Sequence, residues 1–287
     1  MFQRAALMML AVFCAQAQER RVEPTFLRRF VPGLVEKASD LTTPTCHYKP
    51  IFGEGDSDAR VLRGIIRFGE ALLDPGGTSG QVNYPNEEQV YVITHGEGIL
   101  LYGQEKVPLR KHDFVYLPPG VRHGIENTSS ASCRWIVMGF RIPSGVLVPQ
   151  PSKPLLANID DVPKEVVAGH PPTTLYQLLM GDRQSKRDKL AAAHVLTSLF
   201  TMEFEPGGTN FPHHHEREEE IYLVLAGHGE MVAGGGMDGI EGRHPAKAGD
   251  AYFFRLNCTV GFYAGNKPGE EKSRILAVRS SFPFSSR

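Results

Sequence analysis

The sequence predicts an all-β fold made of two tandem barrels, and three observations support this prediction. The 287-residue chain is 41% hydrophobic and contains 30 glycines and 21 prolines, which suits many short strands and turns. An acidic-Pro-Gly-Gly-Thr sequence at residues 74–78 recurs at residues 205–209. Each copy follows alternating apolar residues, at 65–73 and 196–205, which predicts a strand that ends in a turn.

The repeat continues beyond these turns at the same offset. Residues 87–93 align with residues 218–224, and a Gly-x-Gly pair that is typical of a hairpin follows in both copies. Short strands separated by regular turns are characteristic of sandwiches and barrels. We therefore expect each copy to form its own β-barrel.

This repeat divides the chain into six parts. They are a signal peptide at 1–17, an N-terminal arm at 18–59, a first barrel at 60–141, a linker at 142–193, a second barrel at 194–281 and a tail at 282–287. The linker is Pro-rich and then polar, and we expect it to pack between the barrels with a short helix at 174–180.

The first residues predict export. Arg4 precedes an apolar run at 5–14 and the small-residue sequence Ala-Gln-Ala at 15–17, which matches the three regions of a signal peptide. We expect cleavage after Ala17 and a secreted or periplasmic mature protein. No later run reaches the roughly 20 apolar residues of a membrane-spanning helix, so no integral membrane segment is expected after cleavage.

Charge and cysteine content exclude several classes of protein. The chain has 31 Lys+Arg against 32 Asp+Glu and no basic patch, which argues against a nucleic-acid partner. After cleavage, Cys46, Cys133 and Cys258 remain, each alone in the sequence. They therefore predict neither a disulfide scaffold nor a Cys-x-x-Cys metal site, and each is interpreted as a small buried apolar residue.

One polar cluster in the second copy predicts a metal site. On a strand, His213 and His215 would point to the same side, and a hairpin would bring Glu220 from the next strand beside them. Two imidazoles and a carboxylate suit Fe, Mn, Ni or Zn and leave positions open for water or substrate. His214 is expected to point away and residues 216–219 to be exposed.

Two other interpretations of this cluster stay open. Glu219 would supply the carboxylate if the connecting loop were one residue shorter. The segment would be a solvated polar stretch if its three consecutive histidines have no common task.

The spacing of residues 207–227, Gly-x5-His-x-His-x4-Glu-x6-Gly, resembles the first conserved motif of the cupin superfamily. Residues 118–127 in the first copy resemble the second cupin motif, with His123 at the position of its metal-binding histidine. Together with the repeat, the two motifs are similar to those of a bicupin. The resemblance implies two small jelly-roll barrels over 60–281, each with any site inside the barrel mouth.

The departures from the motif restrict where a metal can bind. In the first copy, Val82, Tyr84 and Gln89 replace the expected ligands, so His123 stands alone as a vestigial, substrate-binding or merely barrel-lining residue. In the second copy, Val260 replaces the third histidine. We therefore predict one divalent ion on the three residues of the second copy, with Fe or Mn favoured and Zn or Ni as alternatives.

The arrangement implies a metal-dependent enzyme that acts on a small polar molecule, although no catalytic residue is identified. A single metal motif in the C-terminal barrel is similar to ureidoglycine aminohydrolase-type bicupins, whereas the two-His-one-carboxylate set equally suits a cupin dioxygenase. The alternatives are a non-catalytic protein that binds a sugar or another small molecule, with a structural or absent metal, and a seed-storage-like structural bicupin. A homo-oligomer is compatible with each.

Overall fold

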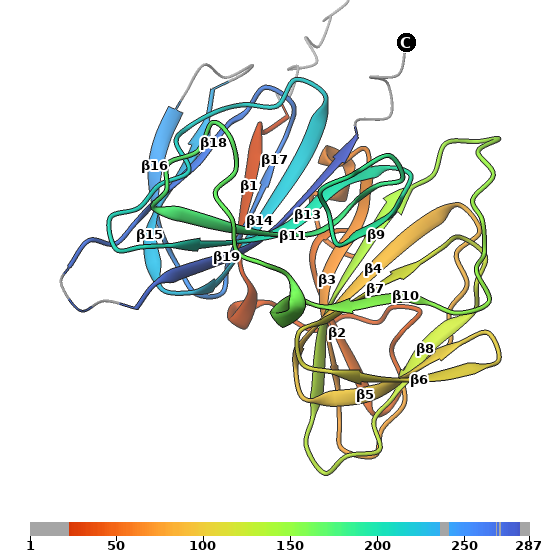
Figure 1. Ribbon diagram of the computed structural model, residues 1–287. Helices are drawn as coiled ribbons and strands as arrows, with labels where there is room; N and C mark the ends of the chain where they lie inside the picture. The colour runs from red at the N-terminus through yellow and green to blue at the C-terminus, as the bar shows by residue number, and fades with distance from the viewer. Residues whose placement is uncertain (1–22, 236–240, 268, 270, 282–287) are drawn as a thin grey trace, which may run out of the picture.

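The chain folds into two β-barrels that lie side by side (Figure 1), in agreement with the all-β prediction. The computed structural model describes residues 23–235, 241–267, 269 and 271–281. The expected signal peptide and tail lie outside these residues. Within the described part of the chain, no helix is long and apolar enough to cross a membrane.

The first barrel packs a six-stranded sheet, in the order β10-β7-β4-β9-β3-β2, on a three-stranded sheet, in the order β6-β5-β8. Its strands are β2 (Cys46–Gly53), β3 (Ile65–Leu73), β4 (Glu87–His95), β5 (Glu97–Tyr102), β6 (Glu105–Arg110), β7 (Asp113–Leu117), β8 (His123–Glu126), β9 (Cys133–Arg141) and β10 (Leu155–Asn158). Strand β3 covers the residues that the alternating pattern predicts.

The second barrel repeats this plan with a seven-stranded sheet, in the order β1-β17-β14-β19-β13-β11-β12, and a three-stranded sheet, in the order β16-β15-β18. Its strands are β1 (Phe26–Phe30), β11 (Thr174–Asp182), β12 (Leu190–Ala193), β13 (Leu196–Phe204), β14 (Glu218–Ala226), β15 (His228–Gly234), β16 (Glu241–Lys247), β17 (Asp250–Phe254), β18 (Thr259–Ala264) and β19 (Ser273–Ser281). Short 3-10 turns are η1 (Val31–Gly33), η2 (Ala59–Val61) and η3 (Ile159–Asp161).

Each barrel has one edge strand that comes from outside its own repeat. In both cases this strand lies in the segment that precedes the other barrel in the sequence. Strand β1 comes before the first barrel in the chain but pairs with β17 of the second, and β10 comes before the second barrel but pairs with β7 of the first. Figure 1 shows the red β1 among the cyan and blue strands. The arm and the linker are therefore parts of the sheets.

The short helix that the sequence predicts at residues 174–180 is wrong, because these residues belong to β11. Burial alternates along the strand: Tyr176 and Leu178 face the interior of the second barrel, whereas Leu179 faces the first barrel. This alternation selects a strand, since it buries apolar side chains on both faces of a sheet that lies between two cores. Strands β11 and β12 thus extend the second sheet into the expected linker.

Three apolar cores hold the molecule together, one inside each barrel and one between them. Along β14, Tyr222 faces the barrel interior and Ile221 faces the shared core, in which the rings of Phe52 and Phe253 lie 6.1 Å apart. The alternation also decides which polar residues of β14 enter the barrel. Cys46, Cys133 and Cys258 are free and buried, as expected.

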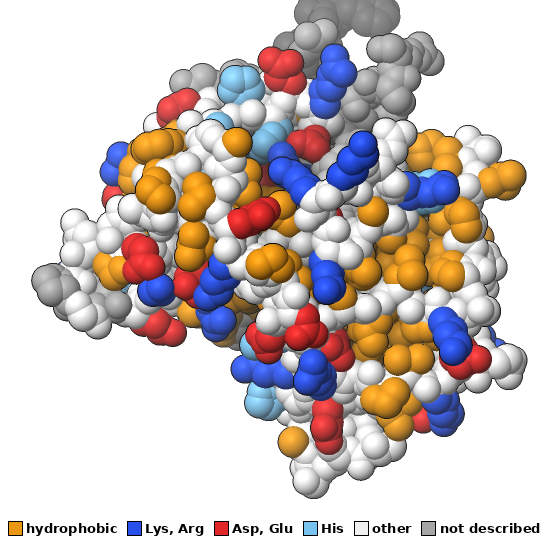
Figure 2. Space-filling model, in the orientation of Figure 1, with side chains coloured by type: hydrophobic (Ala, Val, Ile, Leu, Met, Phe, Trp, Pro, Cys, Tyr) orange, Lys and Arg blue, Asp and Glu red, His pale blue; other side chains and the backbone are white. Residues whose placement is uncertain are grey.

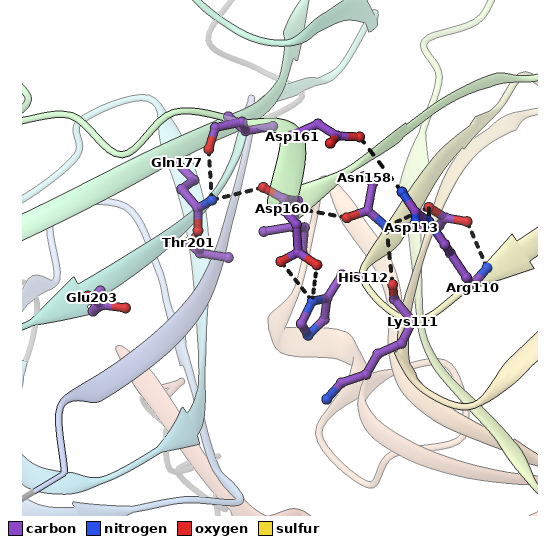
Figure 3. A network of polar contacts seen from close by, with 12 residues as sticks. Arg110, Lys111, His112, Asp113, Asn158, Asp160, Asp161, Gln177, Thr201 and Glu203 are labelled. Atoms are coloured by element: carbon purple, nitrogen blue, oxygen red, sulfur yellow. Dashed lines mark hydrogen bonds and ion pairs between the residues drawn. The ribbon is translucent and has the colours of Figure 1, made fainter.

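The turn η3 connects the two barrels through polar contacts (Figure 3). On one side, Asn158 donates from Nδ2 to a carboxylate oxygen of Asp113 at 2.8 Å. On the other side, Gln177 of β11 donates from Nε2 to the carbonyl oxygen of Ile159 at 2.8 Å. The linker is therefore fixed to both barrels before it enters β11, which carries part of the candidate site.

Candidate metal centre

His213 and His215 lie on an extended loop before β14, not on the predicted strand. A single bridge between His213 and Val260 joins this loop to β18. Because the backbone is extended there, side chains still alternate: the two histidines are half-buried and His214 between them is exposed, as expected. Histidine, acidic and basic side chains gather at this end of the C-terminal barrel (Figure 2).

The three predicted residues come together. Their candidate ligand atoms, one nitrogen each from His213 and His215 and a carboxylate oxygen of Glu220, lie within 4.8 Å of one another. The two imidazole centroids are 5.0 Å apart, with the rings nearly perpendicular. Among the described residues this is the only such group of three or more histidine, cysteine or acidic side chains.

The hydrogen bonding of these residues fits a divalent cation. Nδ1 of His213 donates to the carbonyl oxygen of Phe211 at 2.8 Å, which leaves the lone pair of Nε2 free for a metal. Nε2 of His215 lies 3.3 Å from Oε2 of Glu220, but both atoms are buried and neither makes a hydrogen bond of acceptable geometry. Buried polar atoms without hydrogen bonds need an explanation, and a shared cation provides one.

Electrostatics favour the protonation states that metal ligands need. Burial tends to raise the pKa of Glu220, but the close approach of the His215 imidazole and the charges of His215 and Arg279 outweigh it and hold the pKa below its usual value. Burial lowers the pKa of His213. A carboxylate and a neutral imidazole are the forms that coordinate a metal.

The cluster lines a cavity of about 90 Å³ in the second barrel. This is roughly three times the volume that one water molecule takes in the liquid. The cavity therefore suits a very small ligand next to the metal position. Side chains from β11, β13, β14 and β19 and from the expected linker form its wall.

Charged or titratable side chains that no sequence motif predicts also form this wall, among them His170 and Arg279. His170 of the expected linker places its ring 5.5 Å from that of His213, and its Nδ1 lies 2.7 Å from the carbonyl oxygen of Asn210. Arg279 of β19 lies 3.2 Å from Glu218 and 4.0 Å from Glu220. Neither residue belongs to a motif, and only the fold brings them to the cluster.

Glu219, which the sequence suggested as exposed or as an alternative ligand, is completely buried and points away from the histidines. Its carboxylate accepts hydrogen bonds from the backbone amides of residues 63–65 in the first barrel. The alternation of β14 explains this, because Glu220 faces the barrel interior and its neighbour must face the other barrel. The expectation of exposure was therefore wrong for Glu219.

In the first barrel, polar side chains pair with one another. Nε2 of His123 lies 3.1 Å from Oε1 of Gln89, and Nε of Arg67 donates to Glu87 at 2.5 Å. The Arg67 guanidinium also lies over the Tyr84 ring, 4.3 Å from its centroid. The region of the first barrel that corresponds to the candidate metal cluster thus contains a buried, paired guanidinium.

Comparison with known proteins agrees with the two-barrel fold. The cupin domain model matches residues 69–139 and 200–278, which together make up more than half of the chain. An uncharacterized protein of Methanocaldococcus jannaschii is 33% identical over 81 residues, which cover 28% of this chain and 65% of that protein. An oxalate-binding protein of Thermotoga maritima is 28% identical over 71 residues, covering 25% of this chain and 59% of that protein. The chain thus matches less than two thirds of the length of either relative.

A solved structure of similar fold is the putative glyoxylate induced protein of Pseudomonas aeruginosa. It superimposes with a TM-score of 0.67 at 20% sequence identity, and the alignment covers 89% of each chain. At this level of identity the likeness concerns the fold of both barrels together. With two matched domains and two jelly-roll barrels, the chain belongs to the cupin family and is a bicupin.

Proposed function

We propose that this bicupin binds one divalent metal ion on His213, His215 and Glu220 and acts as a metal-dependent enzyme on a small polar molecule. The observation that carries the proposal is the pair of buried atoms, Nε2 of His215 and Oε2 of Glu220, which face each other without a hydrogen bond. Three protein ligands leave coordination positions open, as catalytic sites require and closed structural sites do not.

A dication bound here would polarise a substrate oxygen, activate a water molecule or bind O₂ together with the substrate. The protein residues supply orientation. The carbonyl oxygen of Phe211 fixes the tautomer of His213, and Arg279 supports the ionised form of Glu220. Glu220 serves as a ligand in this scheme, so it is not available as a general base. Either a dioxygenase or an aminohydrolase-like hydrolase agrees with this arrangement.

Metal analysis tests the proposal directly. Purified protein from medium supplemented with Fe and Mn is expected to carry near-stoichiometric metal, and His213→Ala and His215→Ala should each lose it. His214→Ala is the matched control, because this exposed histidine lies between the two ligands and points away. Wild-type protein without metal, or a His214→Ala variant that loses as much as the other two, would contradict the proposal.

A non-catalytic binding protein is the second candidate. It is favoured by the similarity to a relative named as an oxalate-binding protein. Oxygen consumption and product formation by the Fe-loaded protein, measured across a panel of small acids, phenols and ureides, separate the two. Ligand binding without consumption or product would support the binding protein.

A further inference from the structure

We propose that the cavity of the second barrel holds a small carboxylate, with one end at the metal position and the other end on Tyr176, Ser198 and Arg279. This inference rests on the proposed function, because it uses the same metal cluster. It adds the chemical class of the ligand and the side chains that recognise it.

The first support is a set of buried polar atoms without hydrogen-bond partners. Oη of Tyr176, Oγ of Ser198 and Nε of Arg279 are all buried, and none has a hydrogen-bond partner. All three residues line the cavity that contains the metal cluster. Leaving a buried donor unpaired destabilises a protein, so three such donors in one cavity indicate a ligand that accepts hydrogen bonds.

The strand register explains why the donors share a surface with the metal ligands. Ser198 on β13 lies directly opposite Arg279 on β19, and Arg279 lies opposite Glu220 on β14. Tyr176 lies on β11, which pairs with the other edge of β13. Residues opposite each other on neighbouring strands point to the same face, so donors and metal ligands form one continuous wall.

The charges favour an anion. Glu218 and Glu220 contribute −2, Arg187 and Arg279 contribute +2, and Asp188, which pairs with Arg187, contributes −1, so a bound dication leaves a net charge of +1 around the cavity. Burial and the charge of Glu220 raise the pKa of Tyr176, which keeps its phenol protonated and able to donate. A carboxylate supplies both the compensating charge and the acceptor oxygens, and guanidinium donors match its geometry.

The size of the cavity and a comparison of the two barrels restrict the proposed ligand and its site further. A cavity of about 90 Å³ suits an acid of a few heavy atoms better than an aromatic one. In the first barrel, the register positions of Ser198 and Arg279 are taken by Arg67 and Gly139, and Arg67 is already paired with Glu87. At these two register positions, the first barrel therefore has no counterpart of the Ser198 and Arg279 donors.

The test is calorimetric titration of the full chain loaded with Mn²⁺, with glycolate as the probe and glycolamide as its neutral analogue. We expect glycolate to bind at least about tenfold more tightly than glycolamide, since one charge-assisted hydrogen bond is worth about a factor of ten. Benzoate, titrated under the same conditions, should not bind. Metal content is measured in every sample before titration.

Variants assign the effect to the three donors. Tyr176→Phe, Ser198→Ala and Arg279→Gln should each weaken glycolate binding about tenfold while Mn²⁺ is retained. Arg274→Gln is the matched control, because Arg274 lies on the same strand, is exposed and has no ion-pair partner among the described residues. Tyr176→Phe and Ser198→Ala change only one hydroxyl group, so they test the proposal even if Arg279→Gln fails to fold.

Equal affinities for glycolate and glycolamide would overturn the carboxylate proposal, as would variants that keep Mn²⁺ and bind glycolate like wild type. The proposed metal function would survive both results. Failure of wild-type protein to take up Mn²⁺ or Fe would overturn the proposed function and this inference with it, and the metal analysis shows that result before any ligand is added.

Discussion

Glu88 and Glu219 make the same contact in opposite directions across the interface between the barrels. The carboxylate of Glu88 in the first barrel accepts hydrogen bonds from the backbone amides of residues 194–196, at 2.7–2.9 Å. The carboxylate of Glu219 in the second barrel accepts them from the amides of residues 63–65, at 2.8–3.2 Å. Each glutamate thus holds the start of the other barrel's first repeat strand, β3 or β13.

Removing either carboxylate should destabilise the protein strongly. Glu219→Ala leaves three amides without their acceptor in a buried place, and we expect the free energy of unfolding to fall by about 3 kcal/mol. Urea denaturation followed by circular dichroism measures this change. Glu88→Ala should have a similar effect, whereas Glu216→Ala, at an exposed position of the preceding loop, should change stability by less than about 0.5 kcal/mol. Near-neutral effects at both buried sites would refute this role.

Local sequence signals predicted the barrels well but not their mutual arrangement. Strand β3 was predicted to the residue because an alternating pattern ends in a Pro-Gly-Gly turn. The exchanged strands β1 and β10 could not be predicted, because edge pairing depends on a partner far away in the chain. The helix prediction at residues 174–180 failed because Leu175, Leu178 and Leu179 fit a helical as well as a strand period.

The same holds for the candidate site: residues of a local motif were predicted, whereas residues that distant segments bring in were not. The His-x-His spacing identified the three clustered residues, because their geometry follows from one loop and one strand. Glu219 was misplaced because its partners are backbone amides of the other barrel, which carry no sequence signal. His170 and Arg279 reach the cavity from a linker and a last strand, so only the folded chain brings them near.

The first barrel should remain free of metal after one substitution. Gln89→Glu restores the carboxylate, but Val82 and Tyr84 supply no imidazoles and the Arg67 guanidinium lies over the Tyr84 ring. We expect metal content equal to that of wild type, measured by elemental analysis after loading with Mn²⁺. Two metal ions per chain in this variant would show that the buried guanidinium is no obstacle.

His123 should make stability depend on pH. Burial lowers its pKa from 6.5 to about 4, so the folded chain keeps the ring neutral while the unfolded chain protonates it. The stabilisation is therefore complete above pH 6.5 and is lost as the pH falls from 6.5 toward 4, by up to about 3 kcal/mol. Denaturation at pH 7 and pH 4.5 measures the loss. His123→Gln should reduce it, and an unchanged pH dependence in that variant would contradict the assignment.

His170 should limit the size of the ligand. Its ring closes the cavity next to His213 but lies outside the metal cluster, so His170→Ala should enlarge the cavity and leave the metal content unchanged. We expect titration of the Mn²⁺-loaded variant to detect succinate, which wild type should exclude. His95→Ala, at an exposed position in the first barrel, serves as the control. If neither variant binds succinate, His170 does not limit the size of the ligand.

The loop between the barrels should be cleavable without separating them. Leu147 is 90% exposed, and a single cut beside it would leave β1 with the N-terminal fragment and β10 with the C-terminal one. Because each of these strands is paired with the opposite fragment, we expect the nicked protein to elute from gel filtration at the size of the intact chain. Separation into halves under native conditions would contradict this.

The exchange of β1 and β10 means that neither half of the chain forms a barrel without the other. In covalent order the chain is two successive cupin domains, but in space each barrel is assembled from both halves, as in two subunits that swap their N-terminal arms. The chain is the single-polypeptide counterpart of such an arm-swapped pair. Expressing one half alone would therefore produce a sheet with an uncovered edge together with an orphan strand, and neither half contains a complete barrel.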